Sequence, residues 1–325
     1  MNQKLSSSFK LKYLNLLLVG IALAYLTYKF NDYHQQNYGQ LFIDILTNGN
    51  TSLLFVALIL IPFNYGIEAK KWQILLSPLQ HVSWTNAFKS ILAGITISIF
   101  TPNRTGEVIG KVVYLDLQEK MKAALLNFSG SMAQMICTSL AGLWGTIIYL
   151  NFYSFKEIDL PATQVIYAIA SICTLLAFLI YFNQQKFFTW ISNKKWAKKI
   201  HISFTNQQQF KSSLQVKVLV LSIIRYIVFS SQLVLLLNFC GIHATIFQLF
   251  LLCTVFFLVM WFLPSFALTE LGVRGSVAVM LFQNVSENIS GALLAVVLLW
   301  IINVALPALI GCIYVFNLTG KKDFE

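Results

Sequence analysis

The sequence FTPNRTGEVIGK, residues 100–111, places proline, arginine, glutamate and lysine directly after an apolar run at residues 91–99. The apolar run is typical of the start of a membrane span. Proline breaks a helix, and an ionisable side chain at the bilayer centre costs about 2.5–3.5 kcal/mol on insertion scales. Broken backbone is tolerated in lipid only where protein or a wet cavity covers the freed polar groups. The stretch therefore predicts a turning point inside the membrane.

The composition is that of a polytopic membrane protein. Of the 325 residues, 57% are hydrophobic and only 11% are charged, and the mean hydropathy is +0.70. These values lie outside the range of soluble domains. Apolar stretches near the length of a membrane span lie at residues 11–30, 51–66, 125–150, 164–182, 214–239, 245–263 and 291–316, with a shorter one at 85–100. We therefore expect an all-α polytopic membrane protein.

The basic residues gather on one side of these stretches. The net charge is +11, but in a membrane protein the distribution of Lys and Arg is more informative than their sum. Lysines cluster before the first stretch, at Lys70 and Lys71, in the loop 183–213 and after the last stretch. By the positive-inside rule we expect a multi-pass protein of the cytoplasmic (inner) membrane with both termini in the cytoplasm. No small-residue cleavage site follows the first stretch, so we interpret it as a retained anchor.

The order of crossings predicts two hairpins. Lys70 and Lys120 mark the same side, so the chain between them, at residues 85–117, must enter the membrane and return. By the same count, residues 245–283 must enter and leave from the opposite side. The middle of that segment reads LPSFALTELGVRG, residues 263–275, again with proline, glutamate and arginine. Two opposed re-entrant or broken-helix hairpins in an inverted repeat are how many transporters build a site near mid-membrane. The alternative is a pair of tight interfacial loops between short spans.

Each expected tip carries an ion pair at helical spacing. Glu107 and Lys111 are four residues apart, as are Glu270 and Arg274, and Arg104 stands one turn before Glu107. These pairs either brace the broken helices or form a binding site. In a binding site, Arg104 and Arg274 would hold an anionic headgroup with the help of helix N-termini. The two glutamates would contact a cationic part of the ligand or tune the arginines.

A further arginine, Arg225, lies inside the stretch 214–239, about 16 Å from its start by helical rise. This is too deep for easy snorkelling, so we expect Arg225 to pair with Glu107 or Glu270 or to line the same cavity; a purely structural role is the alternative. The candidate substrate-binding residues are Arg104, Glu107, Lys111, Arg225, Glu270 and Arg274. The candidate structural residues of the tips are Pro102, Gly106, Pro264 and Gly272.

No enzyme constellation emerges from the sequence. The four histidines lie in loops or near span ends, and the five cysteines stand singly in apolar runs. Neither arrangement has the spacing of a metal site, and there is no P-loop or serine elbow motif. We therefore expect no catalytic residues, no metal and no cofactor. The loop 183–213, rich in lysine and interrupted by Trp190 and Trp196, is interpreted as a cytoplasmic interfacial helix that touches anionic lipid rather than nucleic acid.

Three stretches carry a resemblance to a known family: KKWQILLSP at 70–78, TPNRTGEVIGKVVYL at 101–115 and LPSFALTELGVRGSVAV at 263–279. They resemble the signatures of the lysylphosphatidylglycerol synthase transmembrane-region family, which includes the flippase portion of the bacterial multiple peptide resistance factor. The resemblance covers nearly the whole chain. It implies about eight membrane segments and lipid translocation across the cytoplasmic membrane. The positions that match the family motifs are Pro102, Arg104, Gly106, Glu107, Pro264, Glu270, Gly272 and Arg274.

The sequence departs from the bifunctional members of that family, which continue into a soluble aminoacyl-transferase domain. This sequence ends at Glu325, so we expect the lipid-modifying chemistry to be absent and the substrate not to follow from those members. We expect a single integral membrane domain, 1–325, with a first half at about 1–182, the cytoplasmic basic loop 183–213 and a second half at 214–325.

The leading hypothesis is a non-enzymatic lipid translocase, or a transporter of anionic or aminoacylated lipid headgroups, with membrane lipids as its partners. Polyprenyl phosphate belongs to the same substrate class. The alternative is a non-catalytic scaffold or accessory subunit for a lipid- or polyprenyl-phosphate-handling enzyme. An enzyme acting on a lipid phosphate is disfavoured because no nucleophile or metal cluster is recognised. A translocase predicts a partly wet cavity that reaches the tips, whereas a scaffold predicts Glu107 and Glu270 fully paired in a closed core.

Overall fold

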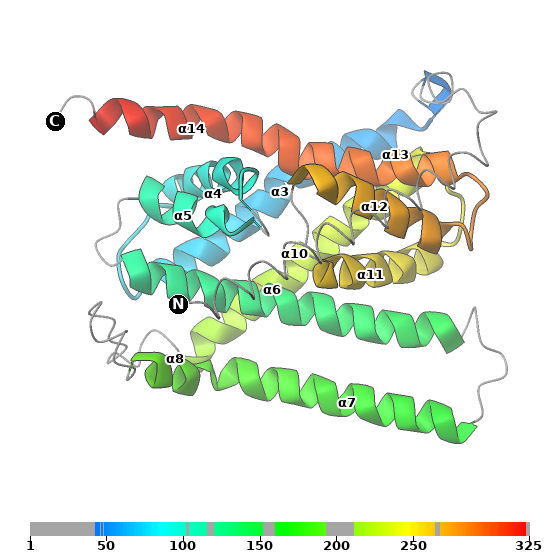
Figure 1. The fold of residues 1–325 in the computed structure, drawn as a ribbon, viewed down its shortest axis with the longest axis horizontal. Helices are drawn as coiled ribbons and strands as arrows, with labels where there is room; N and C mark the ends of the chain where they lie inside the picture. The colour runs from blue at the N-terminus through cyan, green and yellow to red at the C-terminus, as the bar shows by residue number, and fades with distance from the viewer. Residues whose placement is uncertain are drawn as a thin grey trace, which may run out of the picture.

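The structure of the chain is a computed structural model (Figure 1). It describes residues 43–45, 47, 49–101, 104–115, 120–151, 160–192, 211–263 and 267–322. Within these ranges the regular structure is entirely helical, so the expected all-α polytopic architecture is confirmed. The expected first span at 11–30, Pro102, Pro264 and most of the loop 183–213 lie outside the described residues.

Four helices among the described residues are long and apolar enough to cross a membrane. They are α3 (Thr51–Leu76), α6 (Lys120–Tyr149), α10 (Ser212–Phe239) and the continuous helix made of α13 (Ile289–Trp300), the π-helical turn η4 (Ile301–Ala305) and α14 (Leu306–Lys322). In Figure 1, α6 and the α13–α14 helix run along the long direction of the molecule, and α3 and α10 cross it obliquely.

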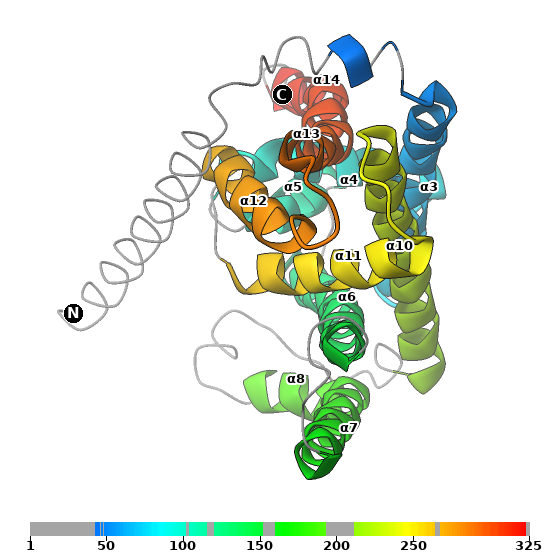
Figure 2. The ribbon, with the colours of Figure 1, turned by 90° about the vertical axis from the view of Figure 1, so that its right-hand side faces the viewer.

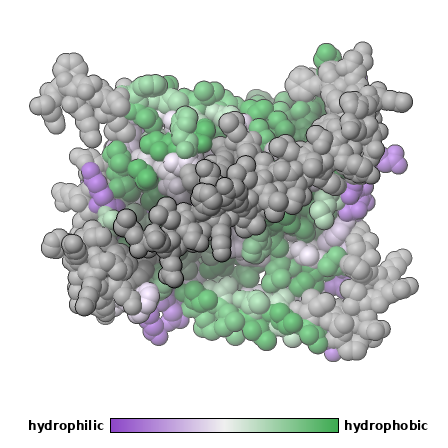
Figure 3. All heavy atoms as spheres, in the orientation of Figure 1, coloured by the Kyte–Doolittle hydropathy of each residue, from purple (hydrophilic) through white to green (hydrophobic). Residues whose placement is uncertain are grey.

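A further long helix, α7 (Leu160–Phe182), lies on the outer side of α6 in both ribbon views, and the short α8 (Gln184–Ser192) follows it (Figure 2). Large apolar side chains of α7, such as Ile172, Leu175 and Ile180, are exposed. This is expected of a helix whose outer face meets lipid. A band of hydrophobic residues crosses the middle of the molecule, and the visible hydrophilic residues gather toward its two ends (Figure 3).

The two predicted turning points form helical hairpins. The first hairpin consists of α4 (Trp84–Ser98) and α5 (Gly106–Tyr114), and the second of α11 (Ile246–Phe262) and α12 (Ala267–Phe282). Their arms have 15, 9, 17 and 16 residues, shorter than the roughly 20 needed to cross a bilayer. The hairpins start from opposite ends of the molecule and their tips meet in the middle (Figure 1).

The same order of elements occurs twice in opposite directions, as expected for an inverted repeat. A long helix, a hairpin and another long helix follow one another as α3, α4–α5, α6 and again as α10, α11–α12, α13–α14 (Figure 1). One end of the molecule, where α3 ends and α4, α6 and α10 begin, carries Lys70, Lys120, Lys186, Lys211 and Lys217. We call it the lysine-rich end.

Two hydrophobic clusters fill the space around the hairpins. One is built mainly from α10 to α13, with residues such as Leu233, Phe256 and Leu299, and the other mainly from α3 to α6, with Trp72 and Leu126. Each cluster also contains residues of the other half, such as Ala57 in the first and Val218 and Ala308 in the second. The halves of the repeat are therefore packed into each other.

The π-helical turn in the last long helix has a local cause. Pro307 has no N–H, so the carbonyl of Asn303, four residues earlier, lacks its helical donor. The hydroxyl of Tyr65 on α3 donates to that carbonyl, and Asn64 Nδ2 donates to Asn303 Oδ1 at 3.1 Å. The broken turn is therefore satisfied by α3 and fixed against it.

The sequence interpretation of α3 was wrong in one respect. The predicted apolar stretch stops at residue 66, but the helix continues to Leu76 through three charged residues, Glu68, Lys70 and Lys71. Lys71, which we counted with Lys70 as a cytoplasmic charge, is buried, while Lys70 is exposed. The apolar count ended the span at its first charges, although charges that face protein do not end a helix.

The two arms of the first hairpin pack closely against each other at Gly94 and Gly110. This close packing predicts an effect on stability. A Cβ at Gly110 would lie 2.6 Å from the Cα of Gly94 on the opposite arm. Gly110→Ala must therefore push the arms apart, and we expect a loss of about 1–3 kcal/mol in the free energy of unfolding. Thermal unfolding in detergent measures it. Gly66→Ala is the control, because its Cβ would meet only Trp84 Cζ2 at 3.4 Å. Equal stability of the two variants would contradict close packing of α4 against α5 at Gly94 and Gly110.

Candidate functional site

A cavity of about 440 Å³ lies where the two tips meet. Residues of α3, α5, α6, α10, α11 and α12 line it, together with Arg104 at the first tip. Its charged lining residues are Glu68, Lys71, Arg104, Glu107, Arg225 and Arg274. Its apolar and aromatic lining residues are Met135, Tyr226, Phe229, Phe257, Met260 and Trp261, and its uncharged polar ones are Ser131, Gln134 and Thr138.

An ion bridge joins the two tips across the cavity. Arg104 Nη2 lies 2.9 Å from Glu270 Oε2 and donates also to Oε1 at 3.1 Å. Arg274 Nε donates to Glu270 Oε1 at 2.9 Å, one helical turn away. Glu270 is thus held between two guanidinium groups, at the start of α12, where a negative charge also complements the helix dipole. The expected Glu270–Arg274 pair is present.

The backbone at the first tip explains the direction of Arg104. Its φ is 56°, in the left-handed region that a non-glycine residue rarely adopts. Arg104 stands one turn before Glu107 in the sequence, and its ion pair is with Glu270 on the other hairpin. Next to it, Thr101 Oγ1 accepts the N–H of Gly106 at 2.8 Å, and a Cβ at Gly106 would lie 2.7 Å from that oxygen.

A second charge cluster, centred on Glu68, is one that sequence reasoning missed. Glu68 Oε2 lies 2.6 Å from Lys71 Nζ and 3.2 Å from Arg225 Nη1, and Oε1 lies 3.3 Å from Lys111 Nζ. Lys111 Nζ in turn lies 2.6 Å from Glu107 Oε1, the expected pair within α5. The sequence could have predicted this cluster. Glu68 and Lys71 are three residues apart, which is helical spacing, and they follow an apolar run with no intervening helix breaker.

Arg225 fulfils one of its two expected alternatives. It lines the cavity, but its acidic partner is Glu68 and not Glu107 or Glu270. Arg225 Nε also donates to Asn64 Oδ1 at 3.0 Å, and its side chain is 26% exposed. The pairing prediction was wrong because α3 supplies a carboxylate at the depth of Arg225, and Glu68 was not considered as its partner.

The remaining predicted site residues, Lys111, Glu270 and Gly272, do not line the cavity. Lys111 and Glu270 are buried and do not line it; each holds a lining residue in place. Gly272 lies in α12, where its carbonyl accepts from Ser276 Oγ at 3.1 Å. Within the described ranges, no three His, Cys, Asp or Glu residues gather as a metal-binding group. The described lining offers charged and hydrogen-bonding groups.

The charge of the cavity is unbalanced. Its lining has four basic residues, Lys71, Arg104, Arg225 and Arg274, against two acidic ones, Glu68 and Glu107. Both α5 and α12 also begin at the tips, so the positive ends of their dipoles face the middle. Surplus positive charge away from water is costly unless an anion balances it. Arginine forks match the oxygens of phosphate, so the site suits an anionic group of this kind.

Removal of the central carboxylate tests the Glu68 cluster. We expect Glu68→Gln to lower the free energy of unfolding by roughly 3–5 kcal/mol, because it leaves buried cations without their shared partner. Thermal unfolding in detergent measures the loss, with the exposed Glu287→Gln as control. The double variant Glu68→Gln/Lys71→Gln should recover part of the stability. If Glu68→Gln is as stable as Glu287→Gln, the cluster does not stabilise the fold.

Comparison with known families agrees with the motifs. The family described as Lysylphosphatidylglycerol synthase TM region matches residues 14–311, a range that contains both tips, the Glu68 cluster and Arg225. A search of curated proteins gave no match. The matched range covers most of the chain, and the described part of it is a bundle of apolar helices. The chain is therefore a multi-pass membrane protein that belongs to the lysylphosphatidylglycerol synthase transmembrane-region family.

Proposed function

We propose that the protein is a lipid translocase that carries lipids with an anionic phosphate headgroup past the meeting tips, without chemical change to the lipid. The observation that carries the proposal is the excess of positive charge in the central cavity, between two opposed hairpins. The family, which is related to lipid flippase function, supports the same class of activity. The aromatic and apolar lining offers a surface for the glycerol and upper acyl region beside the arginines.

The proposed orientation follows from the lysines. In the described residues, the exposed lysines Lys70, Lys120, Lys186, Lys211 and Lys217 all lie at the lysine-rich end. By the positive-inside rule this end faces the cytoplasm. The hairpins are then re-entrant from opposite faces of the cytoplasmic membrane, and the cavity lies near mid-membrane. Both termini are cytoplasmic in this arrangement.

The proposed mechanism is an exchange of anionic partners. The side chain of Arg104 is 37% exposed although it bridges to Glu270, so it has donors left for a phosphate. A phosphate bound by Arg104 and Arg225 competes with Glu270 and weakens the bridge between the tips. Weakening of that bridge lets the two halves of the repeat separate on one side, as alternating access requires. Release of the headgroup restores the Arg104–Glu270 bridge.

A second substrate class has one observation in its favour. The side chain of Glu107 is 33% exposed at the cavity even though it pairs with Lys111, so it can accept from the amine of an aminoacylated headgroup. A scaffold role, the competing class, fits Glu270, which is enclosed by its partners. The surplus of positive charge favours the anionic lipid over both.

A transport assay tests the proposal. The full chain in proteoliposomes is given fluorescent phosphatidylglycerol, lysyl-phosphatidylglycerol or polyprenyl phosphate, and loss of leaflet asymmetry is followed. Loss of one charge-assisted hydrogen bond is worth about 1.5–3 kcal/mol, so Arg225→Gln should slow transfer of the anionic lipid about tenfold or more. Lys186→Gln is the control. If the wild-type protein moves no lipid, the accessory-subunit hypothesis takes precedence.

A paired substitution separates binding from bracing at the tips. Arg104→Gln removes both a headgroup donor and the bridge, whereas Arg104→Gln/Glu270→Gln replaces the bridge by a neutral, hydrogen-bonding pair. We expect transport to stay low in the double variant at wild-type folded yield, because the cation is still missing. Recovery of transport in the double variant would show that Arg104 serves only to brace the hairpins.

A further inference from the structure

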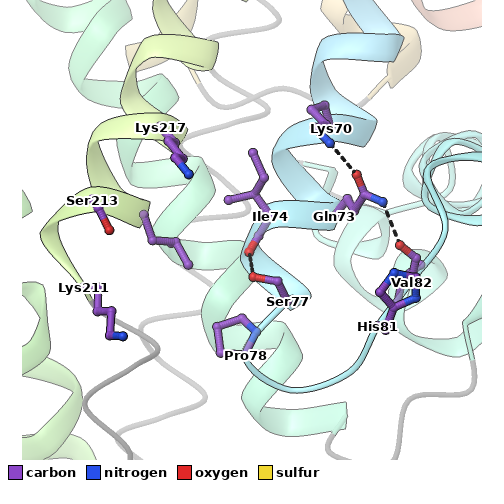
Figure 4. A pocket seen from close by; sticks show the side chains of 11 residues that line it. Lys70, Gln73, Ile74, Ser77, Pro78, His81, Val82, Lys211, Ser213 and Lys217 are labelled. Atoms are coloured by element: carbon purple, nitrogen blue, oxygen red, sulfur yellow. Dashed lines mark hydrogen bonds between the residues drawn. The ribbon is translucent and has the colours of Figure 1, made fainter.

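A second, larger cavity lies at the lysine-rich end, apart from the central site. It measures about 790 Å³ and lies between the end of α3 with the turn that follows it and the start of α10 (Figure 4). It shares none of its described lining residues with the central cavity. Lys70, Lys211, Lys217 and His81 line it, and no acidic residue does within the described part of the chain.

The lysines of this cavity are placed to receive an anion. Lys70 Nζ donates to Gln73 Oε1 at 2.9 Å, and Gln73 Nε2 donates to the carbonyl of Val82 at 2.9 Å (Figure 4). This chain of bonds fixes the ammonium group and leaves it further donors. Lys211 and Lys217 approach from α10, and the described residues give these three lysines no ion pair. Clustered ammonium groups without carboxylates attract an anion.

The start of α10 adds to the positive potential. No side chain caps its first turn, where Lys211 is the N-cap, and Ser213 in that turn lines the cavity. Uncapped N–H groups at a helix start favour a phosphate. The helix has 28 residues, so its dipole is fully developed. Three lysines, a serine and the start of a helix thus line one cavity of about 790 Å³.

An apolar groove continues from this cavity through Lys70. It measures about 410 Å³ and is lined by Pro62, Phe63, Gly66, Ile67, Trp84 and Leu221, besides Lys70. The missing side chain of Gly66 leaves the space open. The indole N–H of Trp84 donates to the Gly66 carbonyl at 3.2 Å and holds the ring beside it. From Lys70 the groove follows α3 backward to Pro62, toward the middle of the molecule.

We infer that the basic cavity and the groove together bind one anionic glycerophospholipid from the leaflet at the lysine-rich end. The phosphate lies among Lys70, Lys211 and Lys217, and an acyl chain lies along the groove beneath Trp84. A free phosphate suits the cavity but gives no role to the groove, whereas a lipid uses both. Trp and Lys side by side are the usual residues at the level of lipid headgroups. The inference is independent of translocation, because it concerns neither the tips nor the central arginines.

Lipid binding to the purified full chain tests the charge requirement. Native mass spectrometry is used to compare phosphatidylglycerol with phosphatidylcholine on wild type, Lys70→Gln/Lys217→Gln and the equally charged control Lys120→Gln/Lys186→Gln. We expect the first double variant to weaken phosphatidylglycerol binding about tenfold or more. The control double variant should bind as wild type does. Equal affinity of the two double variants would overturn the site.

A steric variant tests the groove and separates lipid from free phosphate. Gly66→Leu fills the groove and keeps every lysine, so phosphatidylglycerol binding should fall while binding of glycerophosphoglycerol, the soluble headgroup, stays unchanged. Leu221→Trp narrows the same groove from α10 and replaces Gly66→Leu if that variant does not fold. If neither variant affects phosphatidylglycerol, or inorganic phosphate displaces it at equal concentration, the occupant is a soluble phosphate and the lipid assignment is wrong.

Discussion

The bridge between Arg104 and Glu270 is the contact on which the centre of the molecule depends. The first hairpin turns between α4 and α5 and the second between α11 and α12, in the middle of the molecule, where protein or a wet cavity must cover broken backbone. Glu270 loses much of its hydration there. The guanidinium of Arg274, on the same helix, does not by itself enclose the Glu270 carboxylate. Arg104 completes the enclosure from the opposite hairpin, at the cost of a left-handed backbone. The two breaks therefore stabilise each other, and neither tip is complete alone.

The Glu68 cluster extends the same principle outward. Helices in lipid gain little from the hydrophobic effect when they associate, so polar contacts and close packing decide which helices meet. Glu68 on α3 reaches Lys111 on α5 and Arg225 on α10, and Lys111 Nζ also donates to Asn127 on α6 at 3.3 Å. Four helices thus share one buried network. The residues that hold the fold together also charge the cavity, so the structural and ligand-binding roles expected for these side chains are not exclusive.

Local features of this site were predictable and distant ones were not. The hairpins follow from the order of apolar and basic segments, and the pairs Glu107–Lys111 and Glu270–Arg274 follow from helical spacing. The partner of Arg104 does not, because it lies 166 positions away and depends on a positive φ at the tip. Glu68 escaped notice because a count of apolar residues ends a span at its first charges. Only the packing of α3 against three other helices shows that Glu68 and Lys71 face inward.

Lys71 and Lys111 are buried. Buried lysines of this kind should be left out when membrane orientation is predicted from the distribution of lysines. Lys71 was counted with Lys70 among the cytoplasmic charges, yet Lys71 and Lys111 both belong to the central cluster and carry no information about sidedness. Without Lys71 and Lys111, the exposed lysines of the described residues lie at one end of the molecule. Lys70 and Lys71 show why the distinction cannot come from sequence neighbours. They are adjacent on α3, but about 100° of helical rotation separates them, enough to place one ammonium in the charge cluster and the other at the basic cavity.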